Sequence, residues 1–111
     1  MTEDPLPHSD RALELIAHRF KLLGDPTRLR LLQLLMCGEK SVNELVSALH
    51  CTQANVSKHL GLLTDGGLVN RRKVGVSILY HIADQSLFPL CELVCHSLKE
   101  QSAETTQALT S

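Results

Sequence analysis

Two short helical patterns follow one another directly in this chain, and they limit its fold more than any other feature of the sequence. Ser41 and Glu44 have the spacing of a capping box, which predicts a helix over residues 41–49. Thr52 can cap a second helix over residues 52–65 after a turn of two residues. Two helices joined so closely are typical of a helix-turn-helix, a unit that reads duplex DNA.

The second of these helices has two faces of different chemistry. Val56, Leu60 and Leu63 recur at helical spacing, so they form an apolar face that packs inward. The outer surface carries small or hydrogen-bonding side chains, namely Gln53, Ala54, Asn55, Ser57 and Lys58. We expect Gln53 and Lys58 to contact base edges, because Gln can pair with adenine and Lys can reach guanine.

The remaining polar side chains of this unit are expected to contact the DNA backbone. They are Ser41, Thr52, Asn55 and Ser57, whose hydroxyl and amide groups can bond phosphate oxygens. Ala54 is expected to touch a thymine methyl group or to permit close approach. The alternative, that all of these are ordinary solvated surface residues, is disfavoured by the helix-turn-helix context. His59 falls near the apolar edge and is expected to be a packed, structural histidine.

A hairpin with a basic character is predicted directly after the helix-turn-helix. Apolar residues alternate over residues 76–82, which indicates a strand, and a partner strand is expected over 68–73 around a turn at Val74-Gly75. Three basic residues lie close to this turn: Arg71, Arg72 and Lys73. The hairpin is therefore expected to act as a wing that touches phosphates or the minor groove, although the whole chain has a formal charge of only −1.

Helices are also predicted on both sides of this unit. The first spans residues 10–23, and the next, over residues 26–37, is so rich in leucine that we expect it at the centre of the core. The last begins near Asp84 or Ser86 and extends to Gln101, with one long apolar stripe.

The length of 111 residues suits one domain with one hydrophobic core. We expect this domain to cover residues 10–101, between a flexible N-terminal arm at 1–9 and a disordered tail at 102–111. No apolar run approaches the ~20 residues that span a bilayer. The acidic, proline-bearing start is unlike a signal peptide, so we expect a cytoplasmic protein without membrane contact.

Three segments resemble the ArsR/SmtB family of small bacterial transcriptional repressors. They are Phe20-Lys-Leu-Leu-Gly-Asp-Pro-Thr-Arg-Leu-Arg-Leu-Leu32, Val56-Ser-Lys-His-Leu-Gly-Leu-Leu63 and Gly67-Leu-Val-Asn-Arg-Arg72. The resemblance implies a winged helix-turn-helix, mostly α with a small β-hairpin, that forms a homodimer through its first and last helices. It also implies binding to double-stranded operator DNA and release by an inducer. A twofold dimer predicts a palindromic operator.

The inducer sites of that family are incomplete in this sequence. Members that bind soft metals at the third helix carry Glu-Leu-Cys-Val-Cys-Asp-Leu, whereas this chain has Glu39-Lys-Ser-Val-Asn-Glu-Leu45 and lacks both thiols. Members that bind zinc between the last helices use one Asp, two His and one Glu. Asp84 and Glu100 remain here, but Ser86 and Ser97 stand at the histidine positions, and two carboxylates alone would hold zinc weakly.

Cys91 and Cys95 are the remaining candidates for an inducer site. Their spacing places both on one helical face, where they could share a soft ion such as As(III), Cd(II), Cu(I) or Zn(II). A third ligand could come from His96, Cys37, the partner subunit or the arm. The same thiols could instead sense an oxidant or a reactive sulfur species, or could only pack as small apolar groups. Cys51 is a separate candidate redox thiol, because a helix dipole stabilises a thiolate at that position.

Catalysis and pure protein binding are the competing classes of function. A thiol–disulfide catalyst would need Cys-x-x-Cys, whereas the closest pair here is Cys91-x-x-x-Cys95. No motif supports a hydrolase. A winged helix used only for protein contact would predict an apolar or acidic second helix and no basic wing. The sequence therefore predicts a DNA-binding repressor and no enzyme.

Overall fold

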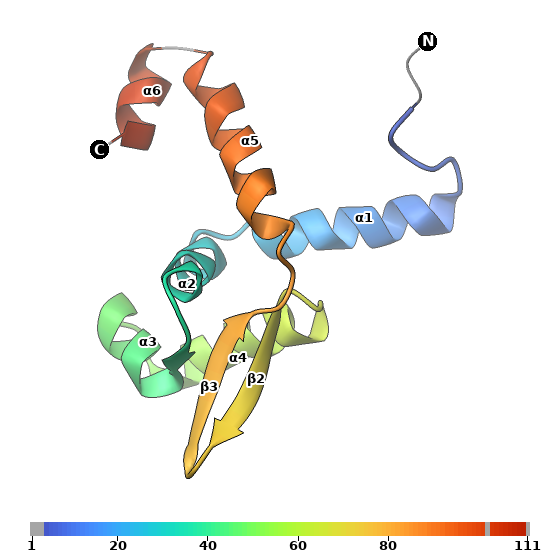
Figure 1. Ribbon diagram of the computed structural model, residues 1–111. Coiled ribbons are helices and arrows are strands. Elements are labelled where there is room, and N and C mark those ends of the chain that lie inside the picture. Colours follow the sequence, from blue (N-terminus) through green and yellow to red (C-terminus); the bar gives the residue numbers. More distant parts are fainter. Residues whose placement is uncertain (1–3, 102, 111) are drawn as a thin grey trace.

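In the computed structural model, which describes residues 4–101 and 103–110, helices surround the base of a small antiparallel sheet (Figure 1). The elements are, in chain order, α1 (Asp10–Leu23), α2 (Pro26–Met36), β1 (Lys40–Ser41), α3 (Val42–Leu49), α4 (Gln53–Asp65), β2 (Val69–Val74), β3 (Ser77–Ile82), α5 (Leu87–Lys99) and α6 (Ala103–Thr110). Each helix and strand expected from the sequence is present close to its expected bounds. The mostly helical fold with a hairpin wing is therefore confirmed.

Local capping sets the limits of the helix-turn-helix. The Ser41 hydroxyl accepts a hydrogen bond from the Glu44 amide, while the Glu44 carboxylate accepts one from the Ser41 amide. The hydrogen bond that the Ser41 amide donates to the Glu44 carboxylate lowers the pKa of Glu44. Thr52 Oγ1 accepts from the Asn55 amide and starts α4. His50, with φ of 55°, supplies the left-handed residue that turns the chain between the two helices.

One hydrophobic core lies between α2, α3, α4 and the base of the hairpin. Its buried residues are Leu22, Leu31, Leu32, Leu35, Leu45, Val56, Leu60, Leu63, Leu68, Val69, Ile82 and Leu87. Helix α2 contributes three of them, as expected for a leucine-rich central helix. Helices α1 and α5 contribute only Leu22 and Leu87, and both project away from the core (Figure 1).

The sheet has one strand that the sequence did not predict. Its order is β1-β3-β2, with Lys40 opposite Tyr80 and Ser41 opposite Leu79. A strand of two residues has no measurable alternation, so only its tertiary pairing defines it. The hairpin turn contains Gly75 at φ of 62°, a backbone conformation that favours glycine.

The two ends of the chain differ from each other. Residues 4–9 form neither helix nor strand, as expected for an arm, although its flexibility stays a prediction. The prediction of a disordered tail is wrong for residues 103–110, because they form helix α6, which packs against α5. Ala, Glu, Gln and Leu in this segment favour a helix, and tertiary contact with α5 adds to that preference. The parts of both predictions that fall on residues 1–3, 102 and 111 lie outside the described residues. Among the helices described, none has the length and apolar character to cross a membrane.

Candidate functional site

The outer face of α4 carries the side chains expected to read DNA. All five are exposed: Gln53, Ala54, Asn55, Ser57 and Lys58. The opposite face is fully buried at Val56, Leu60 and Leu63, so packing fixes which side of the helix faces outward. Lys58 forms no ion pair with another described residue, which leaves its charge available for a phosphate or a base. Its contact with DNA stays a prediction.

Gly61 also lies on this outer face, and sequence reasoning missed it. It follows Lys58 by three residues, near the middle of α4. A Cβ atom at this position would meet nothing within 4 Å, so packing does not require glycine there. Glycine within a helix costs about 0.5–1 kcal/mol relative to alanine. An isolated glycine inside a helical pattern is unfavourable, and this local cost is the signal in the sequence that marks the position.

Ser41 and Thr52 hold the start of α3 and α4, as described above. Each hydroxyl oxygen accepts a backbone hydrogen bond. The Thr52 hydroxyl keeps its own proton and can also donate it to a phosphate oxygen. The Ser41 hydroxyl also bonds the Glu44 carboxylate, so a phosphate would have to replace that bond. The phosphate contacts of both residues stay predictions.

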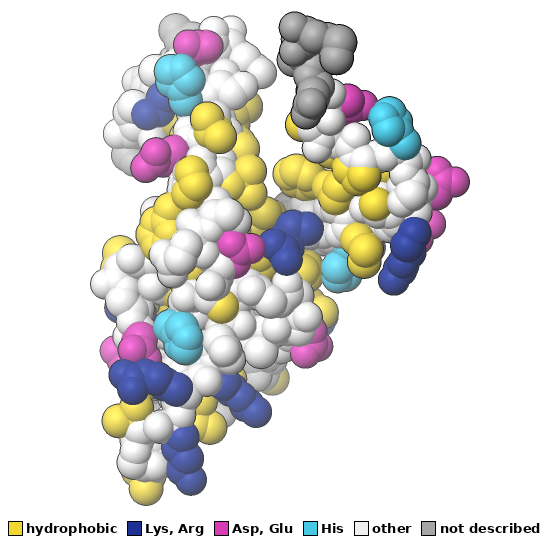
Figure 2. Space-filling view, turned by 45° about the vertical axis from the view of Figure 1, so that its right-hand side comes forward, with side chains coloured by type: hydrophobic (Ala, Val, Ile, Leu, Met, Phe, Trp, Pro, Cys, Tyr) yellow, Lys and Arg dark blue, Asp and Glu magenta, His cyan; other side chains and the backbone are white. Residues whose placement is uncertain are grey.

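The register of the hairpin separates the three basic residues of the wing. Arg71 pairs with Tyr80, Arg72 with Leu79 and Lys73 with Ile78. Side chains alternate along a strand, so Arg71 and Lys73 share one face and Arg72 lies on the other. Arg71 lines a cleft of about 210 Å³ together with residues of α4, which places its face of the wing beside that helix. Figure 2 shows Lys and Arg side chains gathered at this end of the molecule.

Arg72 is already bound within the protein. Its Nε lies 2.8 Å from Glu39 Oε2 and its Nη2 lies 2.9 Å from Glu39 Oε1, a two-point ion pair. The hydrogen bonds from Arg72 lower the pKa of Glu39. The pair ties the wing to the segment before β1. Of the three basic wing residues, Arg72 is thus the least available to DNA.

The extreme tip of the wing is apolar rather than basic. Val76 is 100% exposed, and Val74 and Ile78 beside it are also exposed. The basic residues stand one step back along β2. The wing therefore offers charge along its length and apolar contact at its end.

Arg28 joins α1, α2 and α4. Its Nε donates to Leu22 O at 2.7 Å and its Nη2 to Lys21 O at 3.2 Å, so it holds the last turn of α1. Its Nη1 lies 3.2 Å from His59 Nδ1 on α4. A guanidinium only donates, so Nδ1 is the acceptor and the proton of a neutral ring is on Nε2. His59 thus has the structural role that its position at the apolar edge indicated. The Arg28 amide also lowers the pKa of Asp25, which caps α2.

The carboxylates left from the zinc pattern are engaged elsewhere. Asp84 Oδ1 accepts from the hydroxyl and the amide of Ser86, and Oδ2 accepts from Arg19 Nη1 at 2.9 Å. These bonds, first that from the Ser86 hydroxyl, lower the pKa of Asp84. Glu100 Oε1 lies 3.1 Å from His96 Nε2. Within residues 4–101 and 103–110, no three His, Cys, Asp or Glu side chains come together as a metal site.

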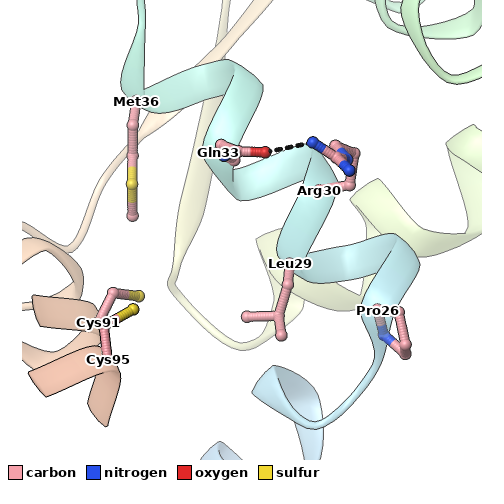
Figure 3. Close-up of a pocket in the computed structure, with 7 residues that line it drawn as sticks. All are labelled: Pro26, Leu29, Arg30, Gln33, Met36, Cys91 and Cys95. Atoms are coloured by element: carbon pink, nitrogen blue, oxygen red, sulfur yellow. Dashed lines mark hydrogen bonds between the residues drawn. The ribbon is translucent and has the colours of Figure 1, made fainter. Parts of the chain in front are cut away.

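Cys91 and Cys95 lie side by side on α5 and face the end of α2 (Figure 3). Both line two adjoining clefts of about 570 and 420 Å³, and Met36 lines the same two clefts. Burial, and then the neighbouring Cys95, raise the pKa of the Cys91 thiol. His96, the predicted third ligand, also lines the smaller cleft, where its ring lies 3.1 Å from Glu100, so its role as a ligand stays a prediction.

The other two cysteines lie apart from this pair. Cys37 is exposed, and its thiol donates to Gln33 O at 3.6 Å. Cys51 is half-buried against the core, and its thiol donates to Leu49 O at 3.6 Å. The geometry gives Cys51 a packing role, and its redox role stays a prediction. Met36, at the end of α2, lines both clefts with the thiol pair of α5 and is a residue that the sequence pattern did not single out.

Comparison with known proteins agrees with this geometry. Residues 25–71 match the family described as "Bacterial regulatory protein, arsR family". The chain is 37% identical over 91 residues to a Streptomyces lividans protein described as "Probable mercury resistance operon repressor". That alignment covers 82% of this chain and 70% of the relative.

Two solved structures share the fold over most of their length. The crystal structure of Mycobacterium tuberculosis Rv0081 has a TM-score of 0.77 at 31% identity, covering 93% of this chain and 100% of that chain. A homodimeric winged helix-turn-helix DNA-binding domain from Mycobacterium bovis has a TM-score of 0.74 at 33% identity, covering 86% and 91%. Both neighbours share the fold of this chain, and the second is described as a winged helix-turn-helix DNA-binding domain. The chain belongs to the ArsR family of bacterial regulatory proteins.

Proposed function

We propose that this protein is a cytoplasmic transcriptional repressor that binds a palindromic operator as a homodimer. The observation that carries the proposal is the outer face of α4, where Gln53 and Lys58 are exposed beside the basic face of the wing. A helix of this kind enters the major groove, while the wing follows the backbone. The family is one of regulators, and the Streptomyces lividans relative is described as a repressor rather than an enzyme.

The apolar faces of α1 and α5 support the homodimer. The exposed apolar side chains on α1 are Leu13, Leu15 and Phe20. Those on α5 are Phe88, Leu93 and Val94. Exposed apolar surface of this extent marks an interaction site. A second copy is the partner that fits, because the Mycobacterium bovis domain is homodimeric. Two recognition helices related by a twofold axis would read half-sites ~34–36 Å apart, or a multiple of that spacing.

Substitutions on α4 test the DNA-reading proposal. Gln53→Ala and Lys58→Ala should each weaken specific binding by ~1–3 kcal/mol, the range for a lost base contact. Fluorescence anisotropy on the DNA upstream of the protein's own gene measures this. Lys21→Ala on α1 is the matched control, since it removes one exposed positive charge far along the chain from α4. Unchanged binding by both α4 variants would overturn the proposal.

The thiol pair supports a soft metal or metalloid as inducer. Cys91 and Cys95 share one face and line a cleft, as a site for a shared ion requires. The raised pKa of Cys91 lowers the thiolate fraction of that residue, which makes this one thiol less reactive toward an oxidant or a reactive sulfur species. A metal ion displaces the proton directly.

A double variant tests the inducer site. Cys91→Ser with Cys95→Ser should keep operator affinity but lose its response to the inducer. A gel shift against As(III), Cd(II), Zn(II), Cu(I), peroxide and polysulfide identifies which agent releases the wild-type protein from DNA. If the double variant still responds to that agent, the two thiols are packing residues.

A further inference from the structure

We propose that Met36 and the thiols of Cys91 and Cys95 form a three-sulfur site selective for Cu(I). This inference rests on the thiol site of the proposed function and adds a third ligand and an ion. The third ligand comes from a different helix, α2, so the site bridges two elements of the fold.

The arrangement of the side chains carries the proposal. In Figure 3, Met36 extends from the end of α2 toward the two thiols, which lie next to each other on α5. The same three residues line both clefts on this side of the molecule. Cys91 and Met36 are half-buried, so part of the site is shielded from water while an ion can still enter past the exposed Cys95.

The set of donors decides which ion fits. Thioether and thiolate sulfur are soft ligands, and the combination of Met with Cys favours Cu(I). Zinc in proteins takes four nitrogen, sulfur or oxygen ligands. In the described part of the chain no third His, Cys, Asp or Glu joins the two thiols as a metal-binding group, and His96, which lines one of the clefts, is paired with Glu100. A thioether is neutral and suits a monovalent ion better than a divalent one, which gains more from a charged ligand.

The balance of charge is also favourable. Each cysteine that becomes a thiolate ligand releases one proton to solvent, so a fully thiolate-bound site releases two protons for each ion. Two thiolates, one thioether and one Cu(I) then carry a single negative charge. Lys99 lines the smaller cleft, so one positive side chain stands near that charge, beside the negative Glu92. Arg30 lines the other cleft, but its guanidinium points away from the thiols and is bonded to Gln33 (Figure 3).

A bridge between α2 and α5 connects the ion to DNA binding. Helix α2 packs against α4, the DNA-facing helix, and α5 carries half of the proposed dimer face. Leu87, at the first turn, is the only fully buried residue of α5, so the rest of this helix is held less firmly to the core of its own chain. An ion that binds more tightly when α2 and α5 lie at one angle stabilises the conformation with that angle. It therefore changes the fraction of dimers that fit the operator.

Copper binding by variants tests the site. Anaerobic competition against a chromophoric Cu(I) chelator gives the affinity of wild type, Met36→Leu, Cys91→Ser with Cys95→Ser, and the exposed-thiol control Cys37→Ser. Met36→Leu should weaken the affinity for Cu(I) by at least about tenfold, because substitution of residues that only support metal ligands already costs that much. The affinity for Cd(II) should change little. The double serine variant should lose both ions, and Cys37→Ser should bind like wild type.

Selenium provides a direct readout of the third ligand. The sequence contains two methionines, Met1 and Met36. Copper-edge X-ray absorption of selenomethionine-labelled protein should show a copper–selenium distance, which labelled Met36→Leu should lack. This signal reports coordination and does not depend on stability or DNA binding.

The outcomes separate this inference from the proposed thiol site. Unchanged Cu(I) affinity in the double serine variant would remove the thiol site and this inference together. Suppose instead that the double serine variant loses Cu(I), that Met36→Leu binds Cu(I) as wild type does, and that labelled wild type shows no copper–selenium distance. That result would overturn only the three-sulfur site. Leucine and methionine have similar volumes, so a thermal melt of Met36→Leu should confirm that the fold is kept.

Discussion

The central helices and the outer helices of this protein bury their apolar residues to very different extents. Helices α2, α3 and α4 with the hairpin base supply all but two of the buried core residues. Helices α1 and α5 supply one each and leave larger side chains exposed, including Phe20 at 58% and Leu93 at 66%. The unit proposed to read DNA is thus packed within one chain, whereas the outer helices leave exposed the apolar faces that the proposed second copy would cover.

This contrast assigns different roles to the two regions. Packing inside one chain fixes which face of α4 points outward, so reading depends on the fold of each subunit. In the proposed dimer, the spacing between two such faces would depend on α1 and α5, and so would the affinity for a full operator. Substitutions that act on one region and leave the other intact should separate the two effects.

Breaking the dimer should have the largest effect. Leu93→Glu places a charge on the exposed apolar face of α5, and a buried unpaired charge would oppose association. Sedimentation should show a folded monomer, and operator affinity should fall by ~10²-fold or more, because linked half-site binding is lost. Leu93→Met is the apolar control and should remain dimeric. A Leu93→Glu protein that still dimerises would mean that α5 does not form the interface.

Within the DNA-reading region, Lys73 and Arg72 should differ. Lys73→Ala should reduce the slope of log affinity against log salt by about one, since one phosphate contact disappears. Arg72→Ala should change the slope less, because Glu39 already holds the guanidinium. Glu39→Gln should release the Arg72 guanidinium so that it can contact a phosphate, and it should make log affinity fall more steeply with log salt. Equal slopes for Lys73→Ala and Arg72→Ala would show that DNA breaks the Arg72–Glu39 pair.

The sequence predicts what local chemistry determines. The capping box at Ser41, the cap at Thr52 and the spacing of Val56, Leu60 and Leu63 depend on neighbours within a turn or two, and the structure has all of them. The exposed face of α4 follows from that spacing. The DNA-facing candidates could therefore be named from the sequence alone.

Contacts between distant segments explain the rest. Strand β1 exists only because β3 lies beside it, and the Arg72–Glu39 and Arg28–His59 contacts join residues about thirty positions apart. Neither distance nor orientation between such residues is encoded in a local pattern. The place of Met36 beside Cys91 and Cys95 is of the same kind, since it depends on how α5 returns to α2.

Gly61→Ala should move stability and DNA affinity in opposite directions. The added methyl group meets open space, so the folded state should gain about 0.5–1 kcal/mol from better helix propensity. If the DNA approaches α4 closely at this point, the same methyl group should weaken operator binding. Urea denaturation and anisotropy measure the two quantities on one sample. Higher stability with unchanged affinity would place Gly61 outside the interface.

The smallest effect is expected at Asp84, where Arg19 ties α1 to the start of α5 within one chain. Hydrogen bonds from Ser86 and the pair with Arg19 lower the pKa of Asp84 below its ordinary value of 3.8. The stability from this carboxylate is therefore fully present above pH 3.8 and is lost as the pH falls through the lower, folded-state pKa.

Asp84→Asn should thus destabilise the protein by about 0.5 kcal/mol at pH 7, a small value because the pair is partly exposed. Urea midpoints at fixed protein concentration, taken from pH 7 down to pH 3, should show the difference between variant and wild type shrinking in the acid range. Because dimerisation also contributes to stability, Leu93→Glu is the background in which the tie within one chain can be measured alone. A difference that stays constant with pH would mean that the Asp84 side chain acts through its shape and not through its charge.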